Sequence, residues 1–263
     1  MLRIFFFSVC FMASAIGTVC GIGGGVLIKP VLDAFHVMDV ATVSFLSGCT
    51  VLAMAFYSVS KSAVEKESRV DRRIGFPLAV GAAAGGLMGK WLFSHVSSFF
   101  SSADKVGAVQ AVCLLIVTMG TLVYTIYKKH IATNHIKNPA ACCLIGLGLG
   151  VLSSFLGIGG GPVNLIVLSF FFSMTAKAAA ENSLYVIFYS QAASLLSSVV
   201  AGSIPEFEIS MLMLMAAGGI AGGINGRFWH KKITDQIVDR LFMALMIIII
   251  LINVYNVFVF IKL

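Results

Sequence analysis

The sequence predicts an all-α polytopic membrane protein with two inverted repeats, each consisting of a Gly-broken hairpin and three transmembrane helices. The first observation is composition: 59% of the residues are hydrophobic, 11% are charged and the mean hydropathy is +1.00. Such a chain has too few polar residues to cover a water-soluble globule of 263 residues. The second is that apolar stretches of roughly 20 residues, long enough to span a bilayer, recur along the chain. The third is a pair of glycine motifs that occurs twice at nearly the same spacing.

The apolar stretches are predicted to be helices. In lipid, backbone N–H and C=O groups must be paired within the protein, and a helix pairs them within one segment. A membrane β-barrel would instead show shorter segments of strictly alternating polarity. Uninterrupted spans are expected at about residues 40–60, 74–93 and 106–127, and again at about 181–200, 211–228 and 241–260.

The glycine motifs indicate that the chain contains an internal duplication. The sequence GIGGG occupies residues 21–25 and 157–161, an offset of 136, and each copy interrupts an apolar stretch. A second motif, GxxxGxxxG followed by a basic residue, begins at Gly81 and again at Gly218, an offset of 137. Two unrelated motifs that keep one spacing are the signature of repeated halves.

The duplication predicts a first transmembrane repeat at residues 1–130 and a second at residues 139–263. Residues 1–20 have the basic start and apolar middle of a signal peptide. We expect this stretch to be retained, because its removal would break the symmetry of the two halves.

The loop charges favour inverted halves. If each broken segment is a hairpin that returns to its starting side, thirteen Lys and Arg collect on one side and three on the other. If each broken segment crosses fully, giving eight spans, the split is ten against six. Positively charged loops stay in the cytoplasm, so the hairpin arrangement is favoured, with both termini outside. The thirteen comprise five in 61–73, three in 128–138, Lys177 and four in 227–240.

Other classes of protein are excluded by the placement of the reactive residues. The net charge of +7 comes from Lys and Arg in short loops, so it does not indicate nucleic-acid binding. The six cysteines lie in apolar segments, and the five histidines are not spaced as metal ligands. There is no glycine-rich phosphate loop. We therefore expect no enzyme, metal or cofactor, and energy for any transport must come from an ion gradient, the substrate's own gradient or a partner protein.

The two glycine-rich breaks are the predicted binding site. An unwound stretch frees backbone N–H groups, and the helix that begins after it directs its positive end at the same place, which suits an anionic substrate. Close helix packing is the alternative role for GIGGG, and it is the expected role of the stripes at 81–89 and 218–226. The candidate residues are Gly21, Ile22, Gly23, Gly24 and Gly25, with Gly157, Ile158, Gly159, Gly160 and Gly161.

Two polar residues follow the breaks. Lys29 lies four residues past the first and could attract an anion, or it could snorkel or pair with Asp33 one helical turn on. Its counterpart at an offset of 136 is Leu165. Asn164 follows the second break, and its amide could donate a hydrogen bond to a substrate oxygen or to another helix. Pro162 predicts that a new helix begins there.

Further candidates lie in the spans after the breaks. Ser47 and Ser183 occupy equivalent positions, where hydroxyls could complete a two-fold site or bond to their own helices. Glu181 is the carboxylate near the second break and is the candidate for proton coupling, with a solvated loop position as the alternative. Lys90 and Arg227 are expected to end their spans and anchor them at the interface.

The duplicated motifs give the chain a resemblance to the sulfite exporter TauE/SafE family of membrane permeases. The resemblance rests on GIGGG followed by VLIKP, on GIGGGPVNLIVL, and on the two GxxxGxxxG stripes that end in Lys or Arg. It implies a permease of the bacterial cytoplasmic (inner) membrane that moves a small anion, sulfur-containing or organic, such as sulfite or a sulfonate. A passive anion channel and a membrane scaffold or assembly protein without a substrate remain the alternatives. The coupling ion, with the proton as candidate, the direction of transport and the oligomeric state stay open.

Overall fold

The computed structural model describes residues 2–35, 37–64, 70–99, 103–158 and 160–262, and every regular element within them is helical. The first half contains α1 (Leu2–Cys20), α2 (Gly25–Phe35), α3 (Val40–Val64), α4 (Arg72–Phe99) and α5 (Ala103–Tyr127). A short 3-10 helix, η1 (Lys128–His130), follows α5. The second half contains α6 (Pro139–Phe155), α7 (Pro162–Phe172), α8 (Ala176–Val200), α9 (Ile209–Lys232) and α10 (Asp235–Lys262).

Seven helices of the described residues are long and apolar enough to cross a membrane, namely α1, α3, α4, α5, α8, α9 and α10. Large apolar side chains on their outer faces are exposed, such as Leu251 and Phe258 of α10, which are 65% and 63% exposed. In water such a surface would be unfavourable, whereas in a bilayer it meets lipid. The chain is therefore a multi-pass α-helical membrane protein, as predicted.

Each predicted span lies within a helix of the structure, but the helices are longer than predicted. Helix α4 continues to Phe99 and α9 to Lys232, so Lys90 and Arg227 do not end their spans. The prediction that these two residues end their spans is wrong, because each helix continues past its basic residue. Helix α4 extends more than two turns past Lys90, and α9 extends more than one turn past Arg227.

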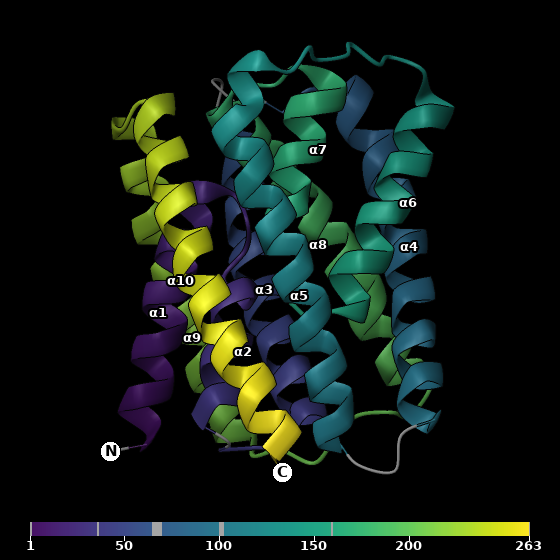
Figure 1. Ribbon diagram of the computed structural model, residues 1–263, viewed down its shortest axis with the longest axis vertical. Coiled ribbons are helices and arrows are strands. Elements are labelled where there is room, and N and C mark those ends of the chain that lie inside the picture. Colours follow the sequence, from purple (N-terminus) through teal and green to yellow (C-terminus); the bar gives the residue numbers. More distant parts are fainter. Residues whose placement is uncertain (1, 36, 65–69, 100–102, 159, 263) are drawn as a thin grey trace.

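The first broken segment returns to the end of the molecule where it began. Both termini lie at one end, the lower end in Figure 1. The segment before α9 also lies at this end: the Glu208 carboxylate is 3.7 Å from the Arg3 guanidinium at the start of α1, and the Glu206 carbonyl accepts a hydrogen bond from the Thr42 hydroxyl at the start of α3. Helices α1 and α3 thus begin side by side, with α1 and α2 forming the hairpin between them.

The second broken segment behaves in the same way at the opposite, upper end. The extended stretch before α6 crosses the top of Figure 1. There the Asn134 N–H donates to the Phe170 carbonyl at 2.7 Å, and the Ile136 N–H donates to the Phe171 carbonyl at 3.0 Å. Since Phe170 and Phe171 belong to the last turn of α7, the chain enters α6 and leaves α7 at the same end.

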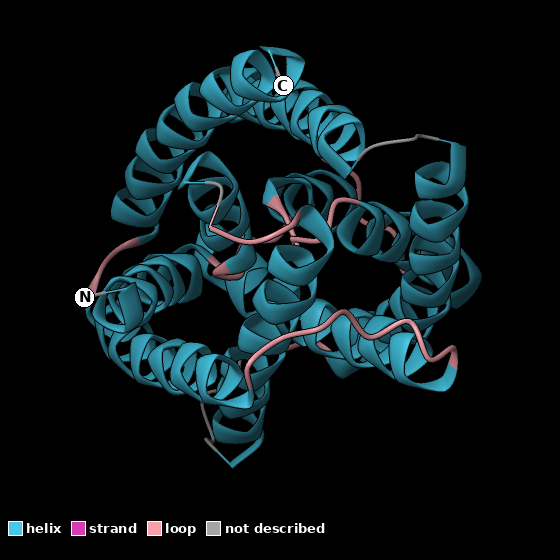
Figure 2. Cartoon of the chain, turned by 90° about the horizontal axis from the view of Figure 1, so that it is seen from below, coloured by secondary structure: helices cyan, strands magenta, loops and turns pink. Residues whose placement is uncertain are grey.

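The two halves pack mainly against each other. The most extensive helix pairs are α4 with α6 and α1 with α9, followed by α4 with α8, α5 with α10 and α3 with α9. Exchanging the helices of one half for those of the other maps these pairs onto one another. Figure 2, seen from the lower end, shows the resulting bundle with both termini at its periphery.

The glycine stripes serve close packing, as expected. A Cβ atom built on Gly85 of α4 would lie 2.1 Å from the Leu147 carbonyl oxygen of α6. The equivalent Gly222 of α9 would bring a Cβ atom within 2.2 Å of the Phe11 carbonyl oxygen of α1. Any side chain would force these helices apart, and small residues are how membrane helices approach each other without that cost.

Candidate functional site

The two breaks adopt backbone conformations that favour glycine. Gly21 and Gly23 have φ angles of 70° and 75°, and Gly157 and Gly160 have φ angles of 66° and 142°. Residues with a side chain rarely adopt such angles, because the Cβ atom approaches the backbone. Pro162 occupies the first position of α7, so the prediction of a helix restart there is confirmed.

The breaks touch each other inside the bundle. A Cβ atom on Gly25 would lie 2.0 Å from the carbonyl oxygen of Ile158, so only glycine allows the two segments to meet. Ile22 is fully buried and Ile158 is 1% exposed. Gly24 and Gly161 are buried as well, while Gly159 lies outside the described residues.

The Lys29 side chain is already paired. Its ammonium lies 2.8 Å from the Asp33 carboxylate one turn along α2, and both side chains are almost wholly buried. The Asn256 amide of α10 donates to the Pro30 carbonyl at 2.9 Å, which ties the same helix to the second half. The alternative in which Lys29 pairs with Asp33 is confirmed, and the charge of Lys29 is compensated within the fold.

Ser47, Ser183 and Asn164, the other polar candidates that follow the breaks, are also buried. Ser47 of α3 and Ser183 of α8 are fully buried on helices that pack directly against each other, and neither hydroxyl has a hydrogen-bond partner. Asn164 is 3% exposed and lines a cavity of about 10 Å³ together with Gly161. Within the described part of the chain, no recorded hydrogen bond or ion pair links these side chains to one another.

A larger polar cavity lies beside the second break. Its volume is about 30 Å³, and Gly157 forms part of its wall. Helices α3, α4 and α5 of the first half and α6 and α8 of the second contribute the rest. Most of these residues lie in the parts of their helices nearest the lower end of the bundle. The polar lining residues are Ser44, Lys90, Gln110, Ser154, Gln191, Ser194 and Ser198.

Several of these side chains have buried polar atoms with no hydrogen-bond partner. They include the amide oxygens of Gln110 and Gln191 and the hydroxyls of Ser44 and Ser154. Each unmet buried group costs about 1–3 kcal/mol. Gln110 is positioned by its amide N–H, which donates to the Phe155 carbonyl at 2.7 Å. The cavity therefore presents groups that water or a polar ligand would satisfy.

Lys90 is the charged group among the described residues that line this cavity. Its ammonium lies 5.3 Å from the centre of the Phe93 ring, a weak cation–π contact. An ionisable group inside a membrane protein is costly unless it faces a partner or a polar cavity, and such positions mark ligand paths. A volume of about 30 Å³ holds a water molecule or two, so a small anion must also move flexible side chains such as Lys90.

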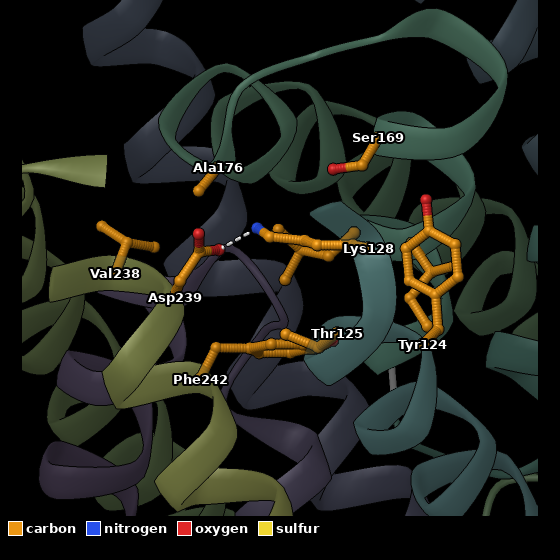
Figure 3. A pocket seen from close by; sticks show the side chains of 10 residues that line it. Tyr124, Thr125, Lys128, Ser169, Ala176, Val238, Asp239 and Phe242 are labelled. Carbon is orange, nitrogen blue, oxygen red and sulfur yellow. Dashed lines mark hydrogen bonds and ion pairs between the residues drawn. The ribbon is translucent and has the colours of Figure 1, made fainter. Parts of the chain in front are cut away.

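A second cavity, of about 20 Å³, is less suited to an anion. Figure 3 shows Lys128 of η1 reaching across it to the Asp239 carboxylate of α10, with which it forms an ion pair. Because the Asp239 carboxylate already neutralises the Lys128 ammonium, this cation is less able to attract an anion. The cavity near Lys90 is the stronger candidate.

Glu181 lies in α8 and is largely buried, so the alternative that places it in a solvated loop is wrong. Its carboxylate is 3.9 Å from Nε2 of His230 on α9. The other ring nitrogen, Nδ1, is 2.8 Å from the Val19 carbonyl at the end of α1. Nearby, the Arg227 guanidinium donates to the Ser58 carbonyl at 3.1 Å. These groups gather toward the upper end of the bundle.

The sequence predictions missed most of the cavity, although a signal for part of it exists. Gln191, Ser194 and Ser198 recur at spacings of three and four, which places them on one face of the apolar helix α8. Gln110 stands alone in an apolar segment and Ser154 follows Ser153 near the end of another, so no periodic pattern marks either residue. They join the site only through the packing of α5 and α6.

Membrane-length helices surround two backbone breaks that touch each other and a polar cavity that holds a cation. This arrangement is typical of one class of protein, the multi-pass membrane transporters. Comparison with known sequences agrees with this class. The family model described as "Sulfite exporter TauE/SafE" matches residues 6–252. The chain belongs to the TauE/SafE family.

Two curated proteins are similar to this chain. The "Probable membrane transporter protein YunE" of Bacillus subtilis (strain 168) is 22% identical over 259 residues, covering 90% of this chain and 92% of that protein. The "Probable membrane transporter protein MamO" of Magnetospirillum gryphiswaldense is 24% identical over 115 residues, covering 42% of this chain and 18% of that protein. No solved structure gives a significant match.

Proposed function

We propose that this protein is a secondary permease that moves a small anion, sulfur-containing or organic, such as sulfite or a sulfonate, across the bacterial cytoplasmic membrane. The observation that carries the proposal is the polar cavity beside Gly157, with Lys90 as its cation and several buried polar groups without partners. An anion could accept hydrogen bonds from the Lys90 ammonium and from the serine hydroxyls at the same time. The description of the family as sulfite exporters favours the same substrate class.

The two breaks, which touch each other, supply the centre of the proposed path. Residues 21–25 and 157–161 meet where Gly25 contacts Ile158, and α2 and α7 begin directly after them. A helix that begins inside the bundle directs free N–H groups and its positive end toward the centre. An anion leaving Lys90 would therefore meet backbone donors rather than apolar side chains.

The proposed topology is a pair of inverted repeats, residues 1–130 and 139–263, with the upper end of the bundle in the cytoplasm. Of the thirteen Lys and Arg that this orientation assigns to the cytoplasm, the eleven within the described residues belong to segments toward the upper end, whereas three belong to segments toward the lower end. The bias of positive charge toward the cytoplasm supports this orientation. Inverted repeats allow one half to open on either side of a central site.

Coupling to protons would use Glu181. Its carboxylate lies 3.9 Å from Nε2 of His230, a second titratable group in a largely buried region, so a bridging water or a small side-chain movement would link the two. Because the chain has no phosphate-binding loop, an ion gradient is the energy source that the residues support best.

The test is uptake of radiolabelled sulfite, thiosulfate and taurine into proteoliposomes, with and without an imposed pH gradient, comparing the wild type with Lys90→Gln. We expect saturable uptake of at least one anion by the wild type and a loss of at least about tenfold in Lys90→Gln, equivalent to about 1.4 kcal/mol. The reason is that the substitution removes the cation of the cavity and keeps a polar side chain of similar size.

Lys105→Gln is the matched control, because Lys105 is exposed in the first turn of α5 and does not line the cavity. Equal uptake by Lys90→Gln and the control would overturn the role of Lys90. Uptake that rises linearly with concentration and ignores the pH gradient would instead indicate a channel. If none of the three anions is taken up, the alternative of a membrane scaffold or assembly protein without a substrate is favoured.

A further inference from the structure

The cavity near Lys90 contains hydrogen-bond acceptors as well as a cation and hydroxyls. Gln110 of α5 and Gln191 of α8 line it, and these residues are 2% and 4% exposed. The amide oxygen of each is buried and accepts no hydrogen bond. A serine hydroxyl can turn to donate or to accept, whereas an amide oxygen can only accept. The two amides therefore require a donor that the described residues do not supply.

The orientation of the Gln110 amide is fixed by the end of α6. Its N–H donates to the Phe155 carbonyl at 2.7 Å. If the amide turned over, its oxygen would face that carbonyl oxygen, and two acceptors cannot form a hydrogen bond with each other. The oxygen of the Gln110 amide is therefore the group that remains free to accept.

The Gln191 amide is held between α8 and α3. A Cβ atom on Gly48 of α3 would lie 2.5 Å from Nε2 of Gln191, so the amide rests directly on the α3 backbone. The next nearest atom, Cδ2 of Leu195, is 3.6 Å from the same built Cβ. A side chain at position 48 would displace the amide, so glycine there gives Gln191 its place in the cavity wall.

Helix packing alone does not require an amide at either position. Leu245 and Met246, at offsets of 135 and 136 from Gln110, are apolar and are 3% and 0% exposed. The counterpart of Gln191 at an offset of 136 is Ala55, which is also fully buried. A buried acceptor without a partner lowers stability, so the two amides are better explained by a ligand than by packing.

The charge of the cavity decides which ligand suits these acceptors. Amide and hydroxyl oxygens could also bind a metal cation, but the Lys90 ammonium in the same cavity repels one. Neither amide oxygen accepts from that ammonium, which lies 5.3 Å from the centre of the Phe93 ring. A ligand that satisfies both kinds of group has a negative charge for Lys90 and an N–H or O–H donor for the glutamines.

We propose that the permease prefers small monoanions that carry a hydrogen-bond donor beside their charged oxygens, with Gln110 and Gln191 accepting from that donor. Hydrogensulfite can present such an O–H, whereas the sulfite dianion has none. A substrate that fills the cavity excludes water from the amides, so one without a donor leaves buried acceptors unpaired. The inference rests on the proposed permease function and narrows its substrate class.

Sulfamate and methanesulfonate test this preference. Both are monoanions of nearly the same size, but sulfamate carries an amino group on its sulfur where methanesulfonate carries a methyl group. The affinity for each is measured from the rise in unfolding temperature of the purified protein in detergent, with the ionic strength held constant. The wild type should bind sulfamate at least about tenfold more tightly, because methanesulfonate offers the amides no donor.

Gln191→Met removes one acceptor and keeps a side chain of similar length. It should lower the preference for sulfamate by about threefold or more and leave the affinity for methanesulfonate unchanged. Gln110→Met should do the same, and the double variant should bind both anions equally. Thr118→Val is the matched control on α5, because Thr118 is fully buried, bonds to the Leu114 carbonyl and does not line the cavity. It should keep the full preference.

The outcomes separate this proposal from the anion site itself. Equal affinities for the two anions in the wild type would overturn the preference, while the site at Lys90 would stand. A preference that survives in the double variant would overturn the role of the glutamines. A parallel loss of both anions in the single variants would show that the amides only position Lys90. If the wild type binds neither anion, both this proposal and the proposed sulfonate site at Lys90 are wrong.

Discussion

Lys29 and Lys90 both lie within helices of the bundle, and their surroundings give them different roles. Lys29 is compensated by Asp33 at 2.8 Å, with both side chains almost wholly buried. Lys90 has no ion pair among the described residues and faces a cavity lined by hydroxyls and amides. A compensated cation offers little to a substrate, whereas an uncompensated one next to a polar cavity attracts an anion.

A charge-removal series on α2 checks the structural role of Lys29. Lys29→Met should lower the stability of the protein by about 3–5 kcal/mol, because the Asp33 carboxylate stays buried without its cation. The double variant Lys29→Met, Asp33→Leu should recover most of that loss, since both charges are gone. Thermal unfolding in detergent measures the stability of each variant.

Uptake by the same double variant separates structure from binding. If Lys29 only holds α2 in place, the double variant should transport anions at a rate near that of the wild type. A double variant that is as stable as the wild type but inactive would show that Lys29 itself binds the substrate.

Among the elements, the short helices α2 and α7 depend most on glycine. Each has 11 residues, too few to cross a bilayer alone, and each begins at a break that contacts the other half. Gly25 begins α2 directly against the Ile158 carbonyl. The two half-length helices are positioned by that contact rather than by their own hydrophobic length.

Gly25→Ala is expected to separate the two breaks. The new Cβ atom would lie 2.0 Å from a backbone oxygen, which cannot move without displacing the second break. We expect a lower unfolding temperature and a loss of uptake. Both quantities are measured on the same purified protein.

Gly148→Ala is the control for this change. Gly148 lies in the helix α6, and a Cβ atom there would meet nothing within 4 Å. The substitution should leave uptake unchanged and stability unchanged or slightly raised, since alanine favours a helix over glycine by about 0.5–1 kcal/mol. Equal behaviour of the two variants would show that the contact between the breaks does not matter for function.

At the scale of the whole molecule, the contacts at the two ends define which segments share a side. The connection between α8 and α9 lies with both termini, and the stretch between η1 and α6 lies at the opposite end. In the proposed topology, these two segments face opposite sides of the bilayer. The excess of Lys and Arg at the upper end favours the cytoplasm for that side.

Labelling of single cysteines checks this topology. Lys137 and Ser203 are exposed, one in each segment, so Lys137→Cys and Ser203→Cys present accessible thiols. In intact cells an impermeant maleimide should label position 203 and spare position 137, and after permeabilisation both should react. Labelling of both positions in intact cells would contradict the inverted arrangement.

The spans and the breaks were predictable because they depend on local chemistry. Apolar runs of sufficient length must become helices in lipid, and Pro162 after a glycine run marks a helix restart. The cavity was not predictable in the same way. Gln110 and Ser154 are ordinary polar residues in apolar helices, and only the packing of α5 and α6 brings them to the wall that Gly157 shares.

The sequence alone determined the helical membrane fold, the duplication and the place of the two breaks, since each follows from residue type and spacing along the chain. Only the tertiary structure decided which cation is compensated, because that depends on distances between side chains, such as those that separate Lys29 from Asp33 and place Lys90 at a cavity. It also revealed the difference between the two halves. Equivalent positions carry Phe45 and Phe93 in one half, where both line the cavity, and Glu181 and His230 in the other.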